Sequence, residues 1–297
     1  MKRRQERYLS LPVIAVISAI AYIYLTTVFI YIERWYGLSS SQGIMNAAAF
    51  TAVAAMCVYT YAIAVLREPG WVPPNYIPDI EDTNNPVHEI KRKSGDLRFC
   101  NKCSHYKPPR AHHCRSCKRC VLKMDHHCIW IDNCVGHANY KIFLIFVMYA
   151  AIACVYSLVM LIGSLTGDSA NDGNPTIYVV SGVVVTPVGV ALLILLGWHV
   201  CLISQNKTTI EVEILECFST KIKFLTDIGQ YHAGVRSMWV AQKEADFDKH
   251  PYDIGLYDNL TVVLGQNVFC WIFPSSHHIG SGLRFRTAYD DSDGRLE

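Results

Sequence analysis

The amino-acid sequence predicts an α-helical integral membrane protein with four transmembrane helices. The first observation is that the apolar residues, which make up 51% of the 297 residues, gather in four runs. Each run is long enough to form the ~20-residue helix that crosses a hydrocarbon layer of ~30 Å. The second observation is that seven of the twelve cysteines fall in a short polar stretch between the second run and the third. The chain therefore combines membrane helices with a small cysteine-rich domain.

The first two runs follow the N-terminus, and with the basic arm before them they make up residues 1–66. The first run, residues 11–32, carries no charged residue. It is longer than the roughly 7–15 apolar residues of a cleavable signal peptide, so we interpret it as a retained helix. The second run, residues 43–66, is rich in alanine, which suits close helix packing in lipid.

A polar segment, residues 67–99, leads from the second run to the cysteine-rich domain. It begins with Glu68-Pro69-Gly70, which by itself indicates only a helix stop at a membrane surface. Four further prolines and the basic cluster Lys91-Arg92-Lys93 follow. We expect a cytosolic linker with little regular structure.

The cysteine-rich domain, residues 100–140, contains two C-x2-C pairs, Cys100/Cys103 and Cys114/Cys117. Zinc prefers four thiolate or imidazole ligands in a tetrahedron, and this short spacing lets two thiolates reach one ion. Two sites of three cysteines and one histidine would use six of the seven cysteines. The seventh, next to histidines and an aspartate, is a candidate nucleophile. A purely structural zinc module is the alternative. We identify no internal repeat.

The third and fourth runs, residues 142–165 and 177–203, place two more transmembrane helices within residues 141–204. Pro187 should kink the fourth helix or leave a gap in its backbone hydrogen bonds. Residues 205–274 form a C-terminal region, in which residues 213–249 are either amphipathic helices on the membrane or a solvated connector. Residues 275–297 are expected to be a disordered tail.

The distribution of Lys and Arg predicts the topology. Residues 72–141 hold twelve of them, residues 166–176 hold none, and residues 33–42 hold only Arg34. Because cytoplasmic segments carry the excess of Lys and Arg, both termini and the cysteine-rich domain should face the cytosol. The cytosol is reducing, so these cysteines do not form a disulfide framework.

Five short motifs follow one another along the chain. They are Glu68-Pro69-Gly70, Asp125-His126-His127-Cys128, Asn133-Cys134-Val135-Gly136, Thr208-Thr209-Ile210-Glu211 and a segment that starts at Asn259. Together they resemble the D-P-G, D-H-H-C, T-T-x-E and C-terminal motifs of the DHHC-type protein S-acyltransferases, or palmitoyltransferases. Ile129 stands where this family usually has Pro, and Asp132 where Asn is common. Neither residue is a ligand or a nucleophile, so we expect tuning of the activity rather than its loss.

The resemblance implies two interleaved structural zinc sites, an assignment that spacing alone could not give. The first zinc would be held by Cys100, Cys103, His113 and Cys120. The second would be held by Cys114, Cys117, His127 and Cys134. Metal binding would then supply much of the folding free energy of a domain with little apolar core.

The resemblance also implies the reaction. Cys128 would attack the thioester of a long-chain acyl-CoA, mainly palmitoyl-CoA, and would then pass the acyl chain to a cysteine of a protein substrate. His126 would take the thiol proton as general base, and Asp125 would orient the imidazole. Partners would be acyl-CoA, the lipid bilayer and cytosolic or membrane proteins with juxtamembrane cysteines.

Further residues receive roles by the same resemblance. Thr209, Glu211 and Asn259 would support the site from the C-terminal region. Trp130 would line the mouth of an acyl-chain cavity, or be an ordinary interfacial tryptophan. Lys107 and Arg110 would meet the CoA phosphates, or form a solvated basic face near anionic lipid. Ala153 would lie at the closed end of the cavity, or pack against neighbouring alanines.

Two functions from other classes compete with acyl transfer. One is a catalytically silent membrane scaffold that uses the zinc module to bind partners. The other is a membrane-tethered nucleic-acid-binding finger, against which the net charge of +2 and the lack of aromatics among the basic residues argue. We therefore expect no nucleic-acid partner. The family resemblance points to the Golgi membrane, with the endoplasmic reticulum and the plasma membrane as alternatives.

Overall fold

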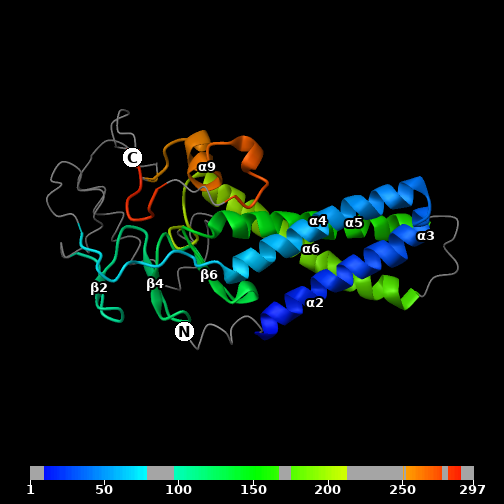
Figure 1. The fold of residues 1–297 in the computed structure, drawn as a ribbon, viewed down its shortest axis with the longest axis horizontal. Coiled ribbons are helices and arrows are strands. Elements are labelled where there is room, and N and C mark those ends of the chain that lie inside the picture. The colour runs from blue at the N-terminus through cyan, green and yellow to red at the C-terminus, as the bar shows by residue number, and fades with distance from the viewer. Residues whose placement is uncertain are drawn as a thin grey trace, which may run out of the picture.

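The computed structural model of the chain describes residues 10–78, 97–166, 175–212, 250, 252–275 and 280–288. Four long helices run along one another, and short strands gather at one end of them (Figure 1). Helix α9, Leu256–Leu264, lies beside the same end. The bundle and the strand region therefore meet at one end of the helices.

All four long helices are long and apolar enough to cross a membrane. They span Leu11–Tyr36, Ser41–Leu66, Tyr140–Thr166 and Pro175–Ser204. Each contains one of the four apolar runs and extends beyond it by up to a few residues, so the prediction of four candidate membrane helices is confirmed. The first comprises α2 (Leu11–Thr26), a π-helical turn η2 (Thr27–Ile32) and α3 (Glu33–Tyr36).

The third long helix, α5 (Tyr140–Thr166), lies at the centre of the bundle. It packs against both α4 (Ser41–Leu66) and α6 (Pro175–Ser204). The indole of Trp35 lies directly on Gly163 of α5, in space that any side chain at this position would fill. Helix α6 continues through Pro187, which has no N–H to donate to the preceding turn.

The cysteine-rich domain consists of three short antiparallel hairpins. These pair β1 (Phe99–Cys100) with β2 (His105–Tyr106), β3 (His112–Cys114) with β4 (Arg119–Val121), and β5 (His126–Cys128) with β6 (Asn133–Val135). The second and third hairpins share one register, since His113 pairs with Cys120 and His127 with Cys134.

The same backbone turn recurs in all three hairpins. Ser104, Lys118 and Asp132, each fourteen residues after the last, have left-handed φ angles of 55°, 55° and 44°. The expectation of no internal repeat was therefore wrong. The repeat is short and is carried by cysteine, histidine and backbone positions, while most side chains between them differ.

The start of the segment before this domain, around residues 70–72, has regular hydrogen bonds to the second hairpin and is not the expected linker with little regular structure. The N–H of Val72 donates to the carbonyl of Cys120 at 3.1 Å, and that of Leu122 donates to Gly70 at 2.9 Å. Val72 is 5% exposed and packs with Cys100 and Leu122. These residues extend the second hairpin along its edge, while Lys91-Arg92-Lys93 lies outside the described residues.

The C-terminal region packs on the same end of the bundle. Asn259 of α9 is fully buried, and its Nδ2 donates to the carbonyl of Ser204 at the end of α6 at 2.8 Å. The expectation of a disordered tail fails for residues 280–288, because Phe285 is 7% exposed and its ring meets that of Tyr252. Leu283 also packs against the cluster of Val72 and Cys100, and Thr287 is 1% exposed, so several side chains hold this segment. Residues 213–249, where amphipathic pieces were considered, lie outside the described residues.

Candidate active site

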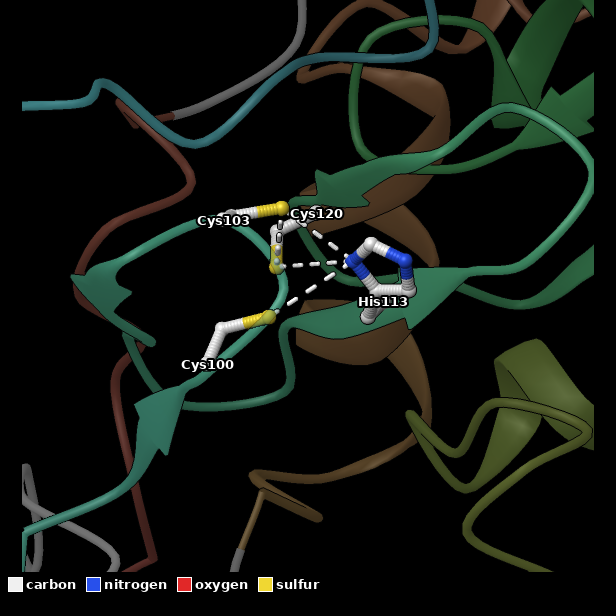
Figure 2. A group of neighbouring side chains, drawn as sticks. All are labelled: Cys100, Cys103, His113 and Cys120. Atoms are coloured by element: carbon white, nitrogen blue, oxygen red, sulfur yellow. Dashed lines mark hydrogen bonds between the residues drawn. The ribbon is translucent and has the colours of Figure 1, made fainter.

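Four side chains from the first two hairpins converge on one point (Figure 2). The Nδ1 atom of His113 lies 3.6 Å from the sulfur of Cys100, 3.1 Å from that of Cys103 and 3.8 Å from that of Cys120. These four residues could hold a metal ion. The group is the first of the two ligand sets that the family resemblance implies.

A second group forms in the same way between the second and third hairpins. The Nδ1 atom of His127 lies 3.7 Å from the sulfur of Cys114 and 3.5 Å from those of Cys117 and Cys134. These four residues could also hold a metal ion. In both groups a histidine and a cysteine come from opposite strands of one hairpin, and a C-x2-C pair comes from the hairpin before it.

The geometry of both groups fits a tetrahedral metal rather than a hydrogen-bond network. A single ring nitrogen cannot form hydrogen bonds with three thiols at once. In a tetrahedral zinc site, bonds of about 2.3 Å to sulfur and about 2.0 Å to nitrogen place sulfur and nitrogen about 3.5 Å apart. The sulfur–nitrogen distances of 3.1–3.8 Å agree with that spacing. Three thiolates and one imidazole form a donor set that zinc prefers.

The alternation of side chains along β5 separates the metal ligand from the remaining groups. Successive residues of a strand point to opposite faces, so His126 and Cys128 share one face while His127 points to the other. His127 belongs to the second metal group, and Cys128 belongs to neither. The strand thereby delivers a histidine and a free cysteine to the same side.

Asp125 is fully buried and has a partner for each carboxylate oxygen. Its Oδ2 lies 2.7 Å from Nδ1 of His126 and accepts the hydroxyl of Thr209 at 2.8 Å. Its Oδ1 accepts the backbone N–H of Thr209 at 2.9 Å. Thr209, which the resemblance assigns a supporting role, therefore contacts Asp125 directly, and the carboxylate fixes the proton of His126 on Nδ1.

The electrostatics favour the charged forms of all three groups. Burial alone would raise the pKa of Asp125, but the hydrogen bond and charge of His126 lower it. Burial alone would lower the pKa of His126, but Asp125 and Cys128 together raise it to about 9. Burial alone would raise the pKa of the Cys128 thiol, but the interaction with His126 lowers it. The cysteine and the histidine are therefore poised to form a thiolate–imidazolium pair.

Cys128 lies where the hairpins meet the membrane helices. It is 8% exposed and belongs to an apolar cluster with Tyr61 of α4 and Phe143 of α5. The hydroxyl of Tyr61 donates to the carbonyl of Trp130 at 2.8 Å. Trp130 is 54% exposed, and Ile129 is 59% exposed. Two large apolar side chains that follow Cys128 in the chain are thus exposed.

The structure corrects the expected position of Arg110. It was expected to meet phosphates or to form a solvated basic face, but it is 2% exposed. Its guanidinium donates to both carboxylate oxygens of Glu211, at 2.8 Å and 2.7 Å, and to the backbone carbonyl of Asn206 at 2.7 Å. Arg110 therefore joins the hairpins to the segment after α6. Lys107 is half-buried on the hairpins.

The two remaining residues named from the sequence, Asn259 and Ala153, make their contacts outside the apolar cluster of Cys128. Asn259 joins α9 to the end of α6, which also positions the segment that carries Thr209. Ala153 is 8% exposed within α5 and packs in a second apolar cluster with Ile23 and Val28 of the first helix. The residues that face it from the first helix could not be placed from the sequence.

Two buried residues near Asp125 were missed as parts of the site. One of them is His199 of α6. One of its ring nitrogens lies within 4.8 Å of a carboxylate oxygen of Asp125 and of a ring nitrogen of His126, and its Nδ1 lies 2.9 Å from the hydroxyl of Tyr140. Asn206 receives hydrogen bonds from Arg110 and Lys123. The sequence offered one signal for His199, which is a histidine at the polar end of an apolar run. No sequence pattern marked Asn206.

The chain shows clear similarity to known proteins. The family model described as DHHC palmitoyltransferase matches residues 93–214. Probable protein S-acyltransferase 16 of Arabidopsis thaliana is 58% identical, over 98% of this chain and 96% of the relative. Probable protein S-acyltransferase 15 of the same plant is 40% identical, over 91% of this chain and 99% of the relative.

A more distant similarity covers the central part of the chain. Palmitoyltransferase ZDHHC15 of Xenopus laevis is 34% identical over 67% of this chain and 53% of the relative. The motif order, the two metal-ligand groups and the full-length plant relatives agree with one another. The chain belongs to the DHHC palmitoyltransferase family of protein S-acyltransferases.

Proposed function

We propose that the protein transfers a long-chain acyl group, mainly palmitoyl, from acyl-CoA to cysteines of protein substrates through an acyl-Cys128 thioester. The observation that carries this proposal is the line of contacts Thr209–Asp125–His126 beside a cysteine outside both metal groups. An acidic residue, an imidazole and a thiol in this order form the arrangement of a nucleophile, its base and an orienting group.

The first step forms the acyl-enzyme. His126 takes the proton of Cys128, and the thiolate attacks the carbonyl carbon of the acyl-CoA thioester. A bond forms between the Cys128 sulfur and that carbon, and the bond from the carbon to the CoA sulfur breaks. The CoA thiolate leaves with the proton from His126. Asp125 stabilises the imidazolium while it holds this proton.

The second step repeats the exchange in the other direction. His126 accepts the proton of the substrate cysteine, whose thiolate attacks the acyl carbonyl. Cys128 then leaves as a thiolate beside the imidazolium, and the starting pair is restored. One thioester replaces another in each step, so neither step needs an added energy source.

Zinc is the ion that we assign to both ligand groups. Its contribution when bound is structural, because three thiolates and one imidazole leave no open position for a substrate. The second group uses His127, directly between His126 and Cys128, and so fixes the strand that presents both. The second site would therefore act on the reaction by holding β5 in place, and the first would act less directly by joining the first two hairpins.

The membrane helices suit the acyl chain. A chain of ~16 carbons gains about 0.8 kcal/mol for each methylene that leaves water. Cys128 packs against apolar side chains of α4 and α5, and the nearby Trp130 is largely exposed. We propose that the chain enters between the helices there and that Ala153 lies near its far end. Lys107 remains the candidate for contact with the CoA phosphates.

We further propose that the hairpins and both termini face the cytosol and that the enzyme resides in the Golgi membrane. The Lys and Arg distribution supports this orientation, and the cytosol keeps the thiol of Cys128 reduced. Substrates would then be cytosolic or membrane proteins with cysteines close to the membrane surface.

Incubation of the purified protein with labelled palmitoyl-CoA tests the proposal. We expect hydroxylamine-sensitive label on the wild type and on Cys201→Ser, a matched control that alters an exposed cysteine of α6. We expect no label on Cys128→Ser. A wild-type protein that takes no label would instead support the silent scaffold, and label that persists in Cys128→Ser would show that another residue is the nucleophile.

A further inference from the structure

A polar pocket lies near the proposed catalytic residues but is not lined by any of them. The pocket, with an enclosed volume of about 30 Å³, opens between the ends of three membrane helices, the hairpins and α9. Its positively charged side chains come from the end of α4, the first turn of α5, the segment after α6, and the hairpin region. They are Arg67, Lys123, Lys141 and Lys207, with His137 beside them.

Among the described residues, no acidic side chain lines the pocket. Lys141 donates to the carbonyls of Leu264 and Cys270 and to the hydroxyl of Ser275, all of which are uncharged. Lys123 donates to the amide oxygen of Asn206 at 3.0 Å. Lys123 also interacts with the carboxylates of Glu211 and Asp125, which offset part of its charge. Lys141 is held by neutral acceptors, so the space beside Lys141 and Lys207 favours an anion.

One lining residue supplies an independent sign of a missing partner. Thr208 is 2% exposed, lines the pocket, and its hydroxyl has no hydrogen-bond partner among the described residues. A buried hydroxyl without a partner costs about 1–3 kcal/mol, so such groups usually have a reason. The backbone N–H of Thr208 donates to the carboxylate of Glu211 at 2.9 Å, while its hydroxyl, next to the basic side chains of the pocket, suits an anionic oxygen as acceptor.

The place of the pocket in the fold indicates where the anion comes from. The pocket lies at the level where α4 ends, α5 begins and α6 ends, which is the surface of the membrane that these helices would cross. Beside it, the turn η6 (Val268–Cys270) and the residues after it present Phe269 and Phe273, which are 87% and 51% exposed. Basic pockets between membrane helices with apolar neighbours suit phospholipid head groups.

We propose that this pocket binds the phosphate of an anionic phospholipid, with Thr208 and Lys207 as donors and the positive charge of Lys141 beside them. The small volume suits a bare phosphate rather than a head group with a sugar ring. Thr208 precedes Thr209, whose N–H and hydroxyl both hold Asp125. A bound phosphate therefore contacts the segment that positions the catalytic carboxylate, although its binding does not depend on Cys128.

The test measures the unfolding temperature of the full-length protein in three settings. These are vesicles of phosphatidylcholine alone, vesicles of phosphatidylcholine with phosphatidic acid, and phosphatidylcholine vesicles with free CoA in the buffer. A ligand that binds only the folded state raises this temperature in a concentration-dependent way. We expect a rise with phosphatidic acid that is absent with phosphatidylcholine alone.

Three variants show whether the effect comes from the pocket. Thr208→Val removes only the hydroxyl, and we expect about tenfold weaker binding of phosphatidic acid, since a hydrogen bond to a charged group is lost. It should not lower the unfolding temperature in phosphatidylcholine alone, because the hydroxyl has no partner there. Thr208→Ser should restore binding. Lys207→Gln should weaken it, whereas Lys118→Gln, an exposed lysine outside the pocket, should not.

The remaining outcomes decide between the sources of phosphate. A rise with CoA but not with phosphatidic acid, again lost in Thr208→Val, would overturn the lipid as source and assign the pocket to a soluble phosphate. No rise in any setting would overturn the proposal. A rise with phosphatidic acid that all of the variants retain would place the anion elsewhere and overturn it as well.

Discussion

Thr209 holds both oxygens of the Asp125 carboxylate across 84 residues of sequence, with its N–H at 2.9 Å and its hydroxyl at 2.8 Å. The N–H bond survives any substitution that keeps the backbone, whereas the hydroxyl bond does not. The two contacts can therefore be separated by changing one side chain.

Thr209→Val should slow autoacylation about tenfold, because the lost hydroxyl bond to a charged acceptor is worth roughly 1.5–3 kcal/mol. The metal content should stay that of the wild type, since Thr209 lies outside both ligand groups. Thr209→Ser keeps the hydroxyl and should recover most of the rate. The measurement is single-turnover acylation with metal content in parallel. An unchanged rate in Thr209→Val would show that this contact does not position the catalytic residues.

Cys128→Ser and Cys134→Ser should fail in different ways. Cys128→Ser should lose acylation completely and retain both metal ions and the wild-type unfolding temperature. Cys134→Ser should lose about one metal ion per chain and unfold more easily, because structural zinc contributes directly to folding. Cys114→Ala and Cys120→Ala should resemble Cys134→Ser. Elemental analysis of the purified variants measures their metal content. Loss of metal in Cys128→Ser would show that Cys128 is a metal ligand.

The ion pair of Arg110 and Glu211 should hold the C-terminal region on the hairpins. Arg110→Gln leaves a buried carboxylate without its partner and should cost about 3–5 kcal/mol of stability. Replacement of both residues by Met should cost less than Arg110→Gln alone, because no charge is left unpaired. Denaturant unfolding of the three proteins provides the comparison. Equal losses for Arg110→Gln and the double variant would mean that packing, not charge, governs the site.

The same pair predicts a pH dependence. Burial alone would raise the pKa of Glu211, but the charge and hydrogen bonds of Arg110 hold it far below the ordinary value of 4.5. The carboxylate therefore contributes fully above pH 4.5, and its contribution is lost as the pH falls toward the folded-state pKa. The stability difference between wild type and Glu211→Gln should be constant from pH 7 to about 5 and shrink below pH 4.5. Acid release of metal affects both proteins alike, so a difference that stays constant down to acid pH would contradict the assignment.

Ala153 should set the tolerance for long acyl chains. A small residue at the end of the cavity leaves room for a chain of more than ~16 carbons, and each methylene changes discrimination by about 1–3 kcal/mol. Ala153→Tyr should shift the preference from stearoyl-CoA toward palmitoyl-CoA in direct competition, with total acylation by palmitoyl-CoA preserved. Ala150→Tyr, one turn earlier on α5, controls for the added bulk. If neither substitution changes the preference between stearoyl-CoA and palmitoyl-CoA, Ala153 does not line the cavity.

The sequence predicts the helices well because their signal is local. Twenty or more apolar residues in a row can satisfy their backbone in lipid only as a helix, so the ends of α4 and α5 differ from the apolar runs by no more than two residues. The metal groups required the family resemblance in addition, since many pairings of three cysteines and one histidine satisfy the same spacing.

The contacts that complete the site could not be predicted, because they join residues far apart in the chain. The partner of Arg110 is 101 residues away, and nothing near either residue marks the pairing. A basic residue in a basic segment resembles a surface residue, which explains the incorrect expectation for Arg110. Phe285 was assigned to a disordered tail for the same reason, since composition does not show that one ring meets Tyr252.

The fourteen-residue period of the hairpins bears on the origin of the reactive thiol. Cys100, Cys114 and Cys128 occupy one position of successive repeats, and Cys103, Cys117 and Ile131 occupy the next ligand position. In the first two repeats this pair reaches forward to a histidine and a cysteine of the following hairpin. After the third repeat the chain enters α5 instead, and the buried Ile131 replaces the second cysteine. The proposed nucleophile, Cys128, is thus a ligand-type cysteine whose metal partners the next repeat would have supplied.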